Sequence, residues 1–293
     1  MRLTHSRAVL AMVGVTLMWS TAGVVTRHLE HAASFEVTFW RSFFTLVSLL
    51  VMLPLLRGRA VFARLRQAPR SFWVSGLCWS VMFTAFMLAM TLTTVANVLV
   101  TMSTGPLLTA LGARVFLRHR IPVRTWAAIG VAGGAIAWIY GSQMGQVGTA
   151  GWIGIAVAFA VPVAGATNWT LNQRAHARGE DVDLVPAVGV GALLSSLATL
   201  PLALPFQATP HDLGLLAFLG LFQLAIPCVL AVFCARVLSA PEVSLLALLE
   251  VVFGILLAWL GAGETPDARV LVGGLLVLAA LVTNELLGWR QRT

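Results

Sequence analysis

Long apolar runs separated by short polar stretches dominate the pattern of hydrophobic and polar positions along the chain. A run of about 20 apolar residues is enough for a helix to cross the hydrocarbon core of a bilayer. No stretch between the runs is long enough to hold a soluble domain, so we expect any functional site to lie within the membrane region. The pattern predicts an all-α integral membrane protein with ten transmembrane helices over residues 8–28, 36–56, 71–91, 95–117, 124–141, 150–172, 184–205, 213–235, 242–262 and 268–288.

Composition supports the same class of protein. Hydrophobic residues make up 59% of the 293 positions and charged residues only 10%, whereas soluble domains carry roughly 25% charged residues. The first run follows a short basic start, as in a secretory signal peptide, but it continues without a small-residue cleavage site. We therefore expect this run to remain in the protein as its first helix.

The net charge is +8, and all nineteen basic residues counted in it are arginines, since the chain contains no lysine. A nucleic-acid site needs a basic face on a soluble fold, so no nucleic-acid partner is expected. The arginines instead follow the membrane topology, because cytoplasmic loops of membrane proteins are enriched in positive charge. With the N-terminus in the cytoplasm, all but Arg27, Arg41 and Arg269 fall on the cytoplasmic side. Both termini are therefore predicted to be cytoplasmic, with the protein in the cell inner membrane.

Motifs for catalysis are absent from the sequence. It contains no pair of histidines four residues apart with a glutamate, no Gly-x-Ser-x-Gly and no Gly-rich phosphate loop with a lysine. The six histidines fall near predicted helix ends. Cys78, Cys228 and Cys234 lack metal-ligand spacing, so we expect them to be buried free thiols. The sequence therefore predicts no enzyme activity, no metal and no cofactor.

Tryptophans mark the expected membrane interfaces, with two exceptions. Trp19 and Trp79 fall near the middle of their spans, where an indole N–H needs a hydrogen-bond partner. We interpret these two as cavity-lining residues, although filling of gaps between helices would also explain them. The interfacial positions are Trp40, Trp138, Trp152 and Trp259 on the outer side, and Trp73, Trp126, Trp169 and Trp289 on the inner side.

Two halves of five spans each, residues 8–141 and 150–288, indicate an internal duplication. An odd number of spans per half gives the halves opposite orientations, the inverted repeat found in many transporters. At constant offset, residues 101–119 align with residues 246–264, and a Gly-containing helix follows each segment. Small residues that permit close helix packing occur in both of these helices: Gly130, Gly134, Gly273 and Gly274.

Both ends of this duplicated pattern resemble a known family. The segments LMWSTAGVVTRHL and SFEVTFWRSFFTLVSLL resemble the opening helices of the EamA half-domain, with a Trp in the first helix and an Arg early in the second. The segment LLALLEVVFGILLAWLGAGETPDARVLVGGLLVLAAL resembles the close of that half-domain, with a Glu in the penultimate helix and a Gly-Glu turn. The chain is thus similar over essentially its whole length to the drug/metabolite transporter superfamily. Within it, the Trp-rich helices look most like the aromatic amino-acid exporters.

The two halves depart from the family pattern in different ways. Gly105–Pro106 stand where the family favours Glu–Pro, whereas Glu250–Val251 stand at the matching place in the second half. The turn after this helix carries His119 in the first half and Glu264 in the second. A single deep carboxylate, rather than two, is therefore expected in the pathway.

Glu250 interrupts the apolar stretch LLALLEVVFG. A charged residue at the centre of a membrane helix costs about 2.5–3.5 kcal/mol on insertion scales, so an ionisable residue at this depth is a functional candidate. Two interpretations stay open. The side chain lines a cavity, where it meets a substrate ammonium or exchanges a proton, or it is protonated and hydrogen-bonded to a neighbouring group.

Prolines and polar residues at mid-depth give the other candidates. A proline inside a membrane helix frees a backbone carbonyl, which is tolerated beside protein or a water-filled cavity. Ser and Thr commonly bond to their own helix instead, and Arg41 is expected to reach outward to Glu36 or a lipid phosphate. The predicted substrate-binding and cavity residues are Trp19, Ser20, Trp79, Met82, Phe83, Thr101, Ser103, Pro106, Pro162, Asn168, Gln223, Ser244 and Glu250.

Resemblance and cavity chemistry together predict a secondary transporter that exports amino acids, above all aromatic and other large apolar ones, by alternating access. The resemblance implies that spans 1–4 and 6–9 surround a central cavity while spans 5 and 10 pack outside. Indole faces offer cation–π contact to an ammonium, worth roughly 0.5–2 kcal/mol. The expected partners are the amino-acid substrate and the lipid bilayer, and we expect the chain to act as a monomer.

Other functions stay open at this point. Within transport, the alternative is a drug or other small-metabolite exporter of the same superfamily. From other classes, the alternatives are an integral-membrane enzyme or assembly factor and a channel, although a channel is disfavoured because the pathway lacks rings of charge. The sequence does not decide between proton antiport and facilitated diffusion.

Overall fold

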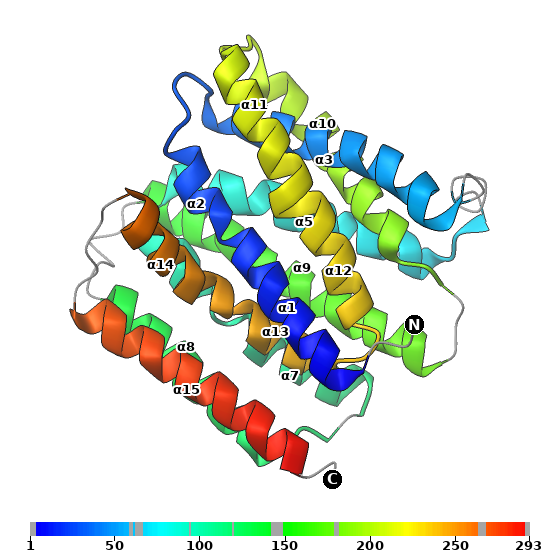
Figure 1. Cartoon of the computed structure of the whole chain (residues 1–293), viewed down its shortest axis with the longest axis vertical. Coiled ribbons are helices and arrows are strands. Elements are labelled where there is room, and N and C mark those ends of the chain that lie inside the picture. Colours follow the sequence, from blue (N-terminus) through cyan, green and yellow to red (C-terminus); the bar gives the residue numbers. More distant parts are fainter. Residues whose placement is uncertain are drawn as a thin grey trace.

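The computed structural model describes residues 4–58, 61, 67–93, 95–118, 120–141, 149–178, 182–262 and 268–290, and every regular element within these ranges is helical. The helices pack into one bundle (Figure 1). His119 and Glu264, at the predicted turns of the two halves, lie outside the described residues.

Ten helical segments match the ten predicted spans, so the predicted fold class is confirmed. Eight of them are long and apolar enough to cross a membrane, and two shorter apolar helices complete the set. The uninterrupted spans are α3 (Ser34–Arg57), α5 (Arg70–Leu92), α8 (Val123–Gly141), α9 (Thr149–Ala177), α10 (Val185–Ala203) and α15 (Ala268–Arg290). The divided spans are α1 (His5–Trp19) with α2 (Thr21–Thr26), α6 (Val95–Met102) with α7 (Gly105–Phe116), α11 (Pro210–Phe218) with a π-helical turn (Leu219–Ala225) and α12 (Ile226–Cys234), and α13 (Ala240–Ala247) with α14 (Leu249–Ala262).

The helices form a packed centre and a separate pair at the edge. α8 and α15, the fifth and tenth spans, lie side by side at one edge of the bundle (Figure 1). α5 packs against both α9 and α10, and α10 packs in turn against α3. Spans from both halves therefore build the centre, and the edge pair occupies the outer position that the family resemblance implied.

Glycine allows the closest of these helix contacts. A Cβ atom at Gly191 of α10 would lie 2.3 Å from the Cβ atom of Trp79 in α5, and one at Gly273 of α15 would lie 2.3 Å from a side-chain atom of α8. Gly273 thus has the predicted packing role. The same prediction is wrong for Gly130 and Gly134, because a Cβ atom there would meet no described atom within 4 Å.

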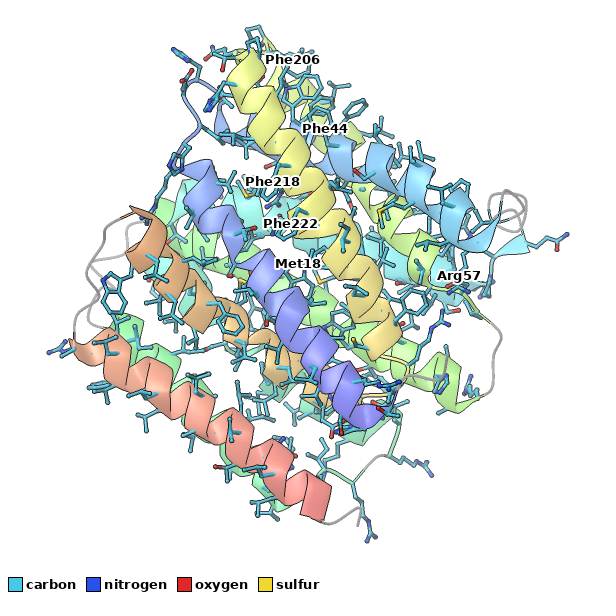
Figure 2. All side chains as sticks on the ribbon, viewed as in Figure 1. Met18, Phe44, Arg57, Phe206, Phe218 and Phe222 are labelled. Atoms are coloured by element: carbon cyan, nitrogen blue, oxygen red, sulfur yellow. The ribbon has the colours of Figure 1, made fainter. Side chains whose placement is uncertain are left out.

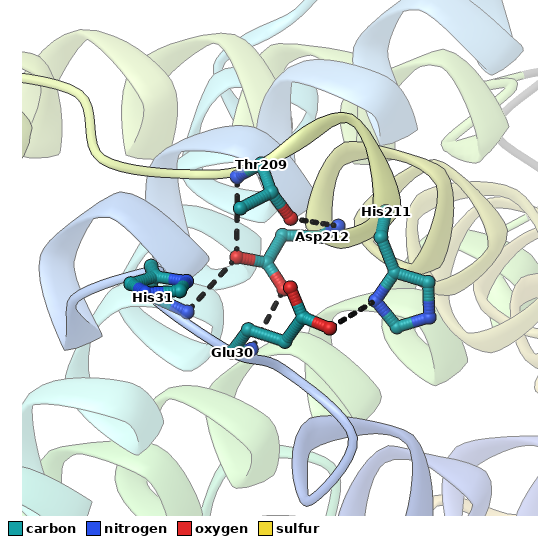
Figure 3. Close-up of polar contacts among 5 residues, drawn as sticks. All are labelled: Glu30, His31, Thr209, His211 and Asp212. Atoms are coloured by element: carbon teal, nitrogen blue, oxygen red, sulfur yellow. Dashed lines mark hydrogen bonds and ion pairs between the residues drawn. The ribbon is translucent and has the colours of Figure 1, made fainter.

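Two buried carboxylates join the starts of α3 and α11, because each one binds the loop that precedes the other helix. Asp212, in the first turn of α11, accepts the backbone N–H of Glu30 at 2.8 Å and that of His31 at 3.1 Å (Figure 3). Glu36, in the first turn of α3, accepts the backbone N–H groups of residues 207–208, each at 2.9 Å. This exchange fixes the two loops at one end of the bundle.

A second polar junction lies at the other end of α3. Asp183 is 3.6 Å from the Arg57 guanidinium and 2.8 Å from that of Arg236. Both guanidinium groups lie over the ring of Phe233, at 5.2 Å and 5.1 Å from its centroid. Figure 2 shows Arg57 far from Phe206, which stacks on the first turns of α3. Charged contacts therefore hold α3 at both ends, and its middle faces the centre of the bundle.

Candidate functional site

Two of the helix breaks occupy corresponding places in the two halves. The span of α6 and α7 breaks at Ser103–Thr104, and the span of α13 and α14 breaks at Leu248. The constant offset that aligns residues 101–119 with 246–264 places Ser103 opposite Leu248. Broken helices in corresponding places of two repeats mark the binding region in many transporters.

Polar groups compensate the breaks in the first and eighth spans. The helix breaks at Ser20, whose hydroxyl donates to a carbonyl of its own helix at 2.7 Å. The side-chain amide of Gln223 donates to the carbonyl of Trp19 beside this break, at 3.3 Å. Gln223 lies in the π-helical turn, just before Pro227, which has no N–H to donate to a helix carbonyl. Such π-helical turns are frequent at functional sites.

A cavity of ≈ 180 Å³ lies where these interrupted spans meet. Its walls come from the first, second, third, fourth, sixth, eighth and ninth spans. None of the described lining residues belongs to α8, α10 or α15. The family resemblance implied that the seventh span, α10, would also line the cavity, and this expectation is wrong. Nine of the predicted residues line the cavity: Trp19, Trp79, Met82, Phe83, Pro106, Pro162, Gln223, Ser244 and Glu250.

Four predicted residues are buried but lie away from the cavity lining. The hydroxyls of Ser20, Thr101 and Ser103 each donate to a carbonyl of their own helix at 2.7 Å. The side-chain oxygen of Asn168 accepts the Ser75 hydroxyl at 2.7 Å and so joins α9 to α5. The three hydroxyls therefore satisfy their own helices, and only Asn168 joins two helices that build the walls.

Pro162 also differs from the expectation, because it does not interrupt its helix. α9 runs without a break from Thr149 to Ala177, with Pro162 inside it. Pro106 instead stands at the start of α7, directly after the break, where its missing N–H leaves no helix carbonyl unpaired. Of these two cavity-lining prolines, only Pro106 therefore marks a break in its span.

Trp169 is a cavity residue that the sequence analysis placed at the inner interface, and that placement is wrong. Its side chain is only 6% exposed, lines the cavity and meets the Trp79 ring edge to face, with 5.7 Å between centroids. α9 extends to Ala177, past the predicted end at residue 172, so Trp169 lies two turns inside the helix. By contrast, Trp73, Trp138, Trp152 and Trp259 are largely exposed, as interfacial tryptophans are.

Arg41 is the second residue that the sequence analysis misplaced. Its side chain is 2% exposed and lines the cavity, so it does not reach outward to a lipid phosphate. The predicted pair with Glu36 is also wrong, because Glu36 binds the Trp40 indole and the loop at residues 207–208 instead. One terminal nitrogen of Arg41 donates to the carbonyl of Phe83 at 3.4 Å.

The cavity therefore contains one positive and one negative side chain in mostly apolar walls. Arg41 and Glu250 influence each other electrostatically, but within the described residues no ion pair closes between them. Apart from Gln223 and Ser244, the remaining lining residues are apolar or small, among them three Trp, two Phe, two Met and three Leu. Apolar walls with a few placed polar groups are typical of small-molecule binding sites.

Several polar atoms of the cavity residues are buried without a protein partner. Nε of Arg41, Nε1 of Trp79 and Oε1 of Gln223 have no hydrogen-bond partner among the described residues. Leaving such a group unpaired costs about 1–3 kcal/mol. The Trp19 indole differs, because it forms a side-chain hydrogen bond with Cys228 in the cavity wall. Two donors and one acceptor of cavity-lining residues thus have no partner among the described residues.

Away from the cavity, Glu30, His211 and Asp212 form a group whose possible ligand atoms lie within 4.8 Å of one another (Figure 3). The Asp212 oxygens already accept three backbone N–H groups, from Glu30, His31 and Thr209. The Glu30–His211 pair is 3.8 Å apart, and both side chains are more than half exposed. We interpret the group as the structural junction between α3 and α11. The three cysteines are buried free thiols, as predicted.

Comparison with known proteins identifies the family of this chain. The profile of the EamA-like transporter family matches the sequence twice, over residues 6–141 and 152–284. A solved structure described as "Crystal structure of protein" is similar over 98% of this chain and 99% of its own, with a TM-score of 0.81 and 17% sequence identity, so it shares the fold. A search of the curated proteins found no match. Because the two profile matches cover most of the sequence, this chain belongs to the EamA-like transporter family, whose members are membrane transporters.

Proposed function

We propose that the protein exports amino acids across the inner membrane, with aromatic and other large apolar ones favoured. The observation that carries this proposal is the composition of the central cavity. Trp19, Trp79 and Trp169 come from three different spans to one cavity that also contains the carboxylate of Glu250. Indole faces suit an apolar or aromatic side chain, and they attract an ammonium by roughly 0.5–2 kcal/mol.

The proposed mechanism is alternating access around this cavity. The break at Ser103–Thr104 is flanked by the cavity-lining residues Met102 and Gly105, and Leu248 at the corresponding break lines the cavity itself. These matching positions support rearrangement of the two halves about a central site. α8 and α15 stay outside as a supporting pair. The sequence contains no phosphate-binding loop with a lysine, so transport would run on solute or ion gradients. A single chain with cytoplasmic termini would suffice.

Flux measurements test the proposal directly. The full-length protein is reconstituted in liposomes and supplied with a panel of labelled amino acids, with and without a pH gradient. We expect flux of tryptophan, phenylalanine and other large apolar amino acids above that of empty liposomes. Absence of flux for every amino acid, together with flux of an unrelated drug-like cation, would favour the drug exporter of the same superfamily instead.

The role of Glu250 is tested in the same liposomes. Glu250→Gln keeps the shape of the side chain but removes its charge and its ability to exchange a proton. We expect a loss of flux of at least tenfold under equal substrate gradients. If the rate and the response to the pH gradient match those of the wild type, Glu250 has only a structural role. The wild-type response to the gradient also separates proton antiport from facilitated diffusion.

A further inference from the structure

We infer that Arg41 and Glu250 together select zwitterions, with the guanidinium binding the α-carboxylate of the substrate and Glu250 binding its α-ammonium. This inference rests on the proposed transport of amino acids and adds the chemical class that the site accepts. It makes Arg41 a specificity-determining residue. An amine without a carboxylate, or a carboxylate without an amine, would then be a poor ligand even if its apolar part fits the cavity.

Arg41 is a buried cation without an acidic partner among the described residues. The side chain is 2% exposed and lines the cavity, and within the described residues no acidic group pairs with it. One terminal nitrogen of Arg41 forms a long hydrogen bond of 3.4 Å to the Phe83 carbonyl, while its Nε has no partner among the described residues. A buried charge needs a partner to offset its desolvation. The planar guanidinium matches a carboxylate with two parallel hydrogen bonds.

Arg41 and Glu250 line one cavity without pairing with each other. Arg41 extends from α3 and Glu250 from α14, and both line the same cavity. They are near enough to act on each other electrostatically, yet no ion pair joins them. A molecule that carries a negative and a positive group on one carbon can contact both. A molecule with a single charge would leave either the buried Arg41 or the half-buried Glu250 unpaired.

Two neutral residues that line the cavity, Trp79 and Gln223, each have a polar side-chain atom without a partner among the described residues. Trp79 precedes Phe83 by one turn of α5, both residues line the cavity, and the Trp79 indole N–H has no partner among the described residues. This donor suits a carboxylate. The free Oε1 of Gln223 is an acceptor in the same cavity and suits an ammonium. The side chain of the ligand would then contact the Trp79 and Trp169 rings.

Three related molecules test the inference in proteoliposomes of the wild-type protein. Labelled L-tryptophan is exchanged against unlabelled L-tryptophan, tryptamine, which lacks the carboxylate, or indole-3-propionate, which lacks the amine. We expect each analogue to compete at least tenfold more weakly than tryptophan. If either analogue competes as well as tryptophan, the inference is overturned while amino-acid transport stands. If tryptophan itself shows no flux above empty liposomes, the proposed function fails first, and the two failures are therefore distinct.

Variants then assign each charge to its group. Arg41→Gln is expected to weaken competition by tryptophan at least tenfold and competition by tryptamine less than twofold. Glu250→Gln is expected to weaken competition by tryptophan at least tenfold and competition by indole-3-propionate less than twofold. Arg57→Gln removes an arginine from the far end of the same helix and is expected to change none of these ratios. If Arg41→Gln weakens all three molecules equally, Arg41 only supports α5 through the Phe83 carbonyl, and the inference is overturned. Should Arg41→Gln fail to give a monodisperse protein, the wild-type comparison of the three molecules decides.

Discussion

At the scale of single residues, the position of Trp79 depends on a missing side chain in a neighbouring helix. Gly191 brings α10 so close to α5 that an added Cβ atom would lie 2.3 Å from the Trp79 Cβ and 3.0 Å from the Gly76 carbonyl oxygen. The Trp79 side chain is 3% exposed and lines the cavity. The seventh span thus contributes to the site indirectly, by fixing a helix that carries lining residues.

Gly191→Ala tests this dependence. The added methyl meets backbone as well as side-chain atoms, so α5 or α10 must move, and overpacking of this kind typically costs about 1–3 kcal/mol. We expect a lower unfolding temperature in detergent and reduced tryptophan flux. Gly130→Ala is the matched control, because its methyl would meet no described atom within 4 Å and alanine favours the helix. Equal unfolding temperatures for the two variants would contradict the argument.

Trp169 and Arg41 were misplaced because the position of a residue within a predicted span does not reveal which neighbours its side chain faces. Trp169 was assigned to the interface because the end of its span was predicted five residues too early, at residue 172 rather than Ala177. Arg41 was assigned outward because it lies near the start of its span. A usable signal was present, since Thr38, Arg41 and Thr45 recur at helical spacing and all three are buried. A polar stripe on a membrane helix indicates the face that is turned away from lipid.

At the scale of elements, the reciprocal caps between α3 and α11 are the clearest structural device outside the cavity. Glu36 and Asp212 are fully buried, and each accepts backbone N–H groups from the loop that precedes the other helix. Each loop is thereby fixed by a residue from the other half of the chain. Sequence alone could indicate a first-turn cap, but not that the capped loop belongs to the other half.

Asp212→Asn should destabilise this junction. An amide has only one acceptor oxygen, so at least one of the three backbone N–H groups that Asp212 binds would lose its bond to the carboxylate, and a hydrogen bond to a charged group is worth about 1.5–3 kcal/mol. We expect a clearly lower unfolding temperature. Glu30→Gln, in the same group but more than half exposed, removes only the pair with His211 and is expected to change little. A larger loss for Glu30→Gln than for Asp212→Asn would refute the assignment.

The junction at the other end of α3 is expected to behave differently. Asp183 and its two arginine partners are each about one third exposed, with side-chain exposures between 33% and 35%. Pairs this exposed contribute about 0–1 kcal/mol and are screened by salt. Asp183→Asn should therefore lower the unfolding temperature less than Asp212→Asn does, and the difference from wild type should shrink in high salt. A salt-independent loss would show that the cluster is less exposed to solvent than its geometry implies.

At the scale of the whole molecule, the ten spans were predictable because apolar length alone specifies a membrane helix. Pro106 marked the break at Ser103–Thr104 in the sequence. The breaks at Ser20 and Leu248 were not predicted, since a membrane helix containing Ser or Leu is normally continuous. The π-helical turn at Leu219–Ala225 was missed for the same reason. Neighbouring helices decide these features: Gln223 binds the freed Trp19 carbonyl, and Thr45 donates to the Gly220 carbonyl at 3.1 Å.

The orientation of the molecule gives a prediction at this scale. The arginine distribution predicts that the N-terminus and the Asp183 junction lie in the cytoplasm and that the loop at Gln207 lies outside. Single cysteines at the exposed positions Thr4 and Gln207 can be probed in intact cells with a membrane-impermeant maleimide, over a low background because the three native thiols are buried. We expect Gln207→Cys to be labelled and Thr4→Cys to be labelled only after permeabilisation. The reverse result would show an inverted topology.

The most direct test of the central claim is to fill the cavity and measure flux. Ala166 of α9 lines the cavity, whereas the next residue, Thr167, is exposed on the outside of the same helix. Ala166→Trp should therefore reduce flux of labelled tryptophan in proteoliposomes to the level of empty liposomes, and Thr167→Trp should leave it close to wild type. Wild-type flux in Ala166→Trp, in a protein shown to be folded, would contradict the account.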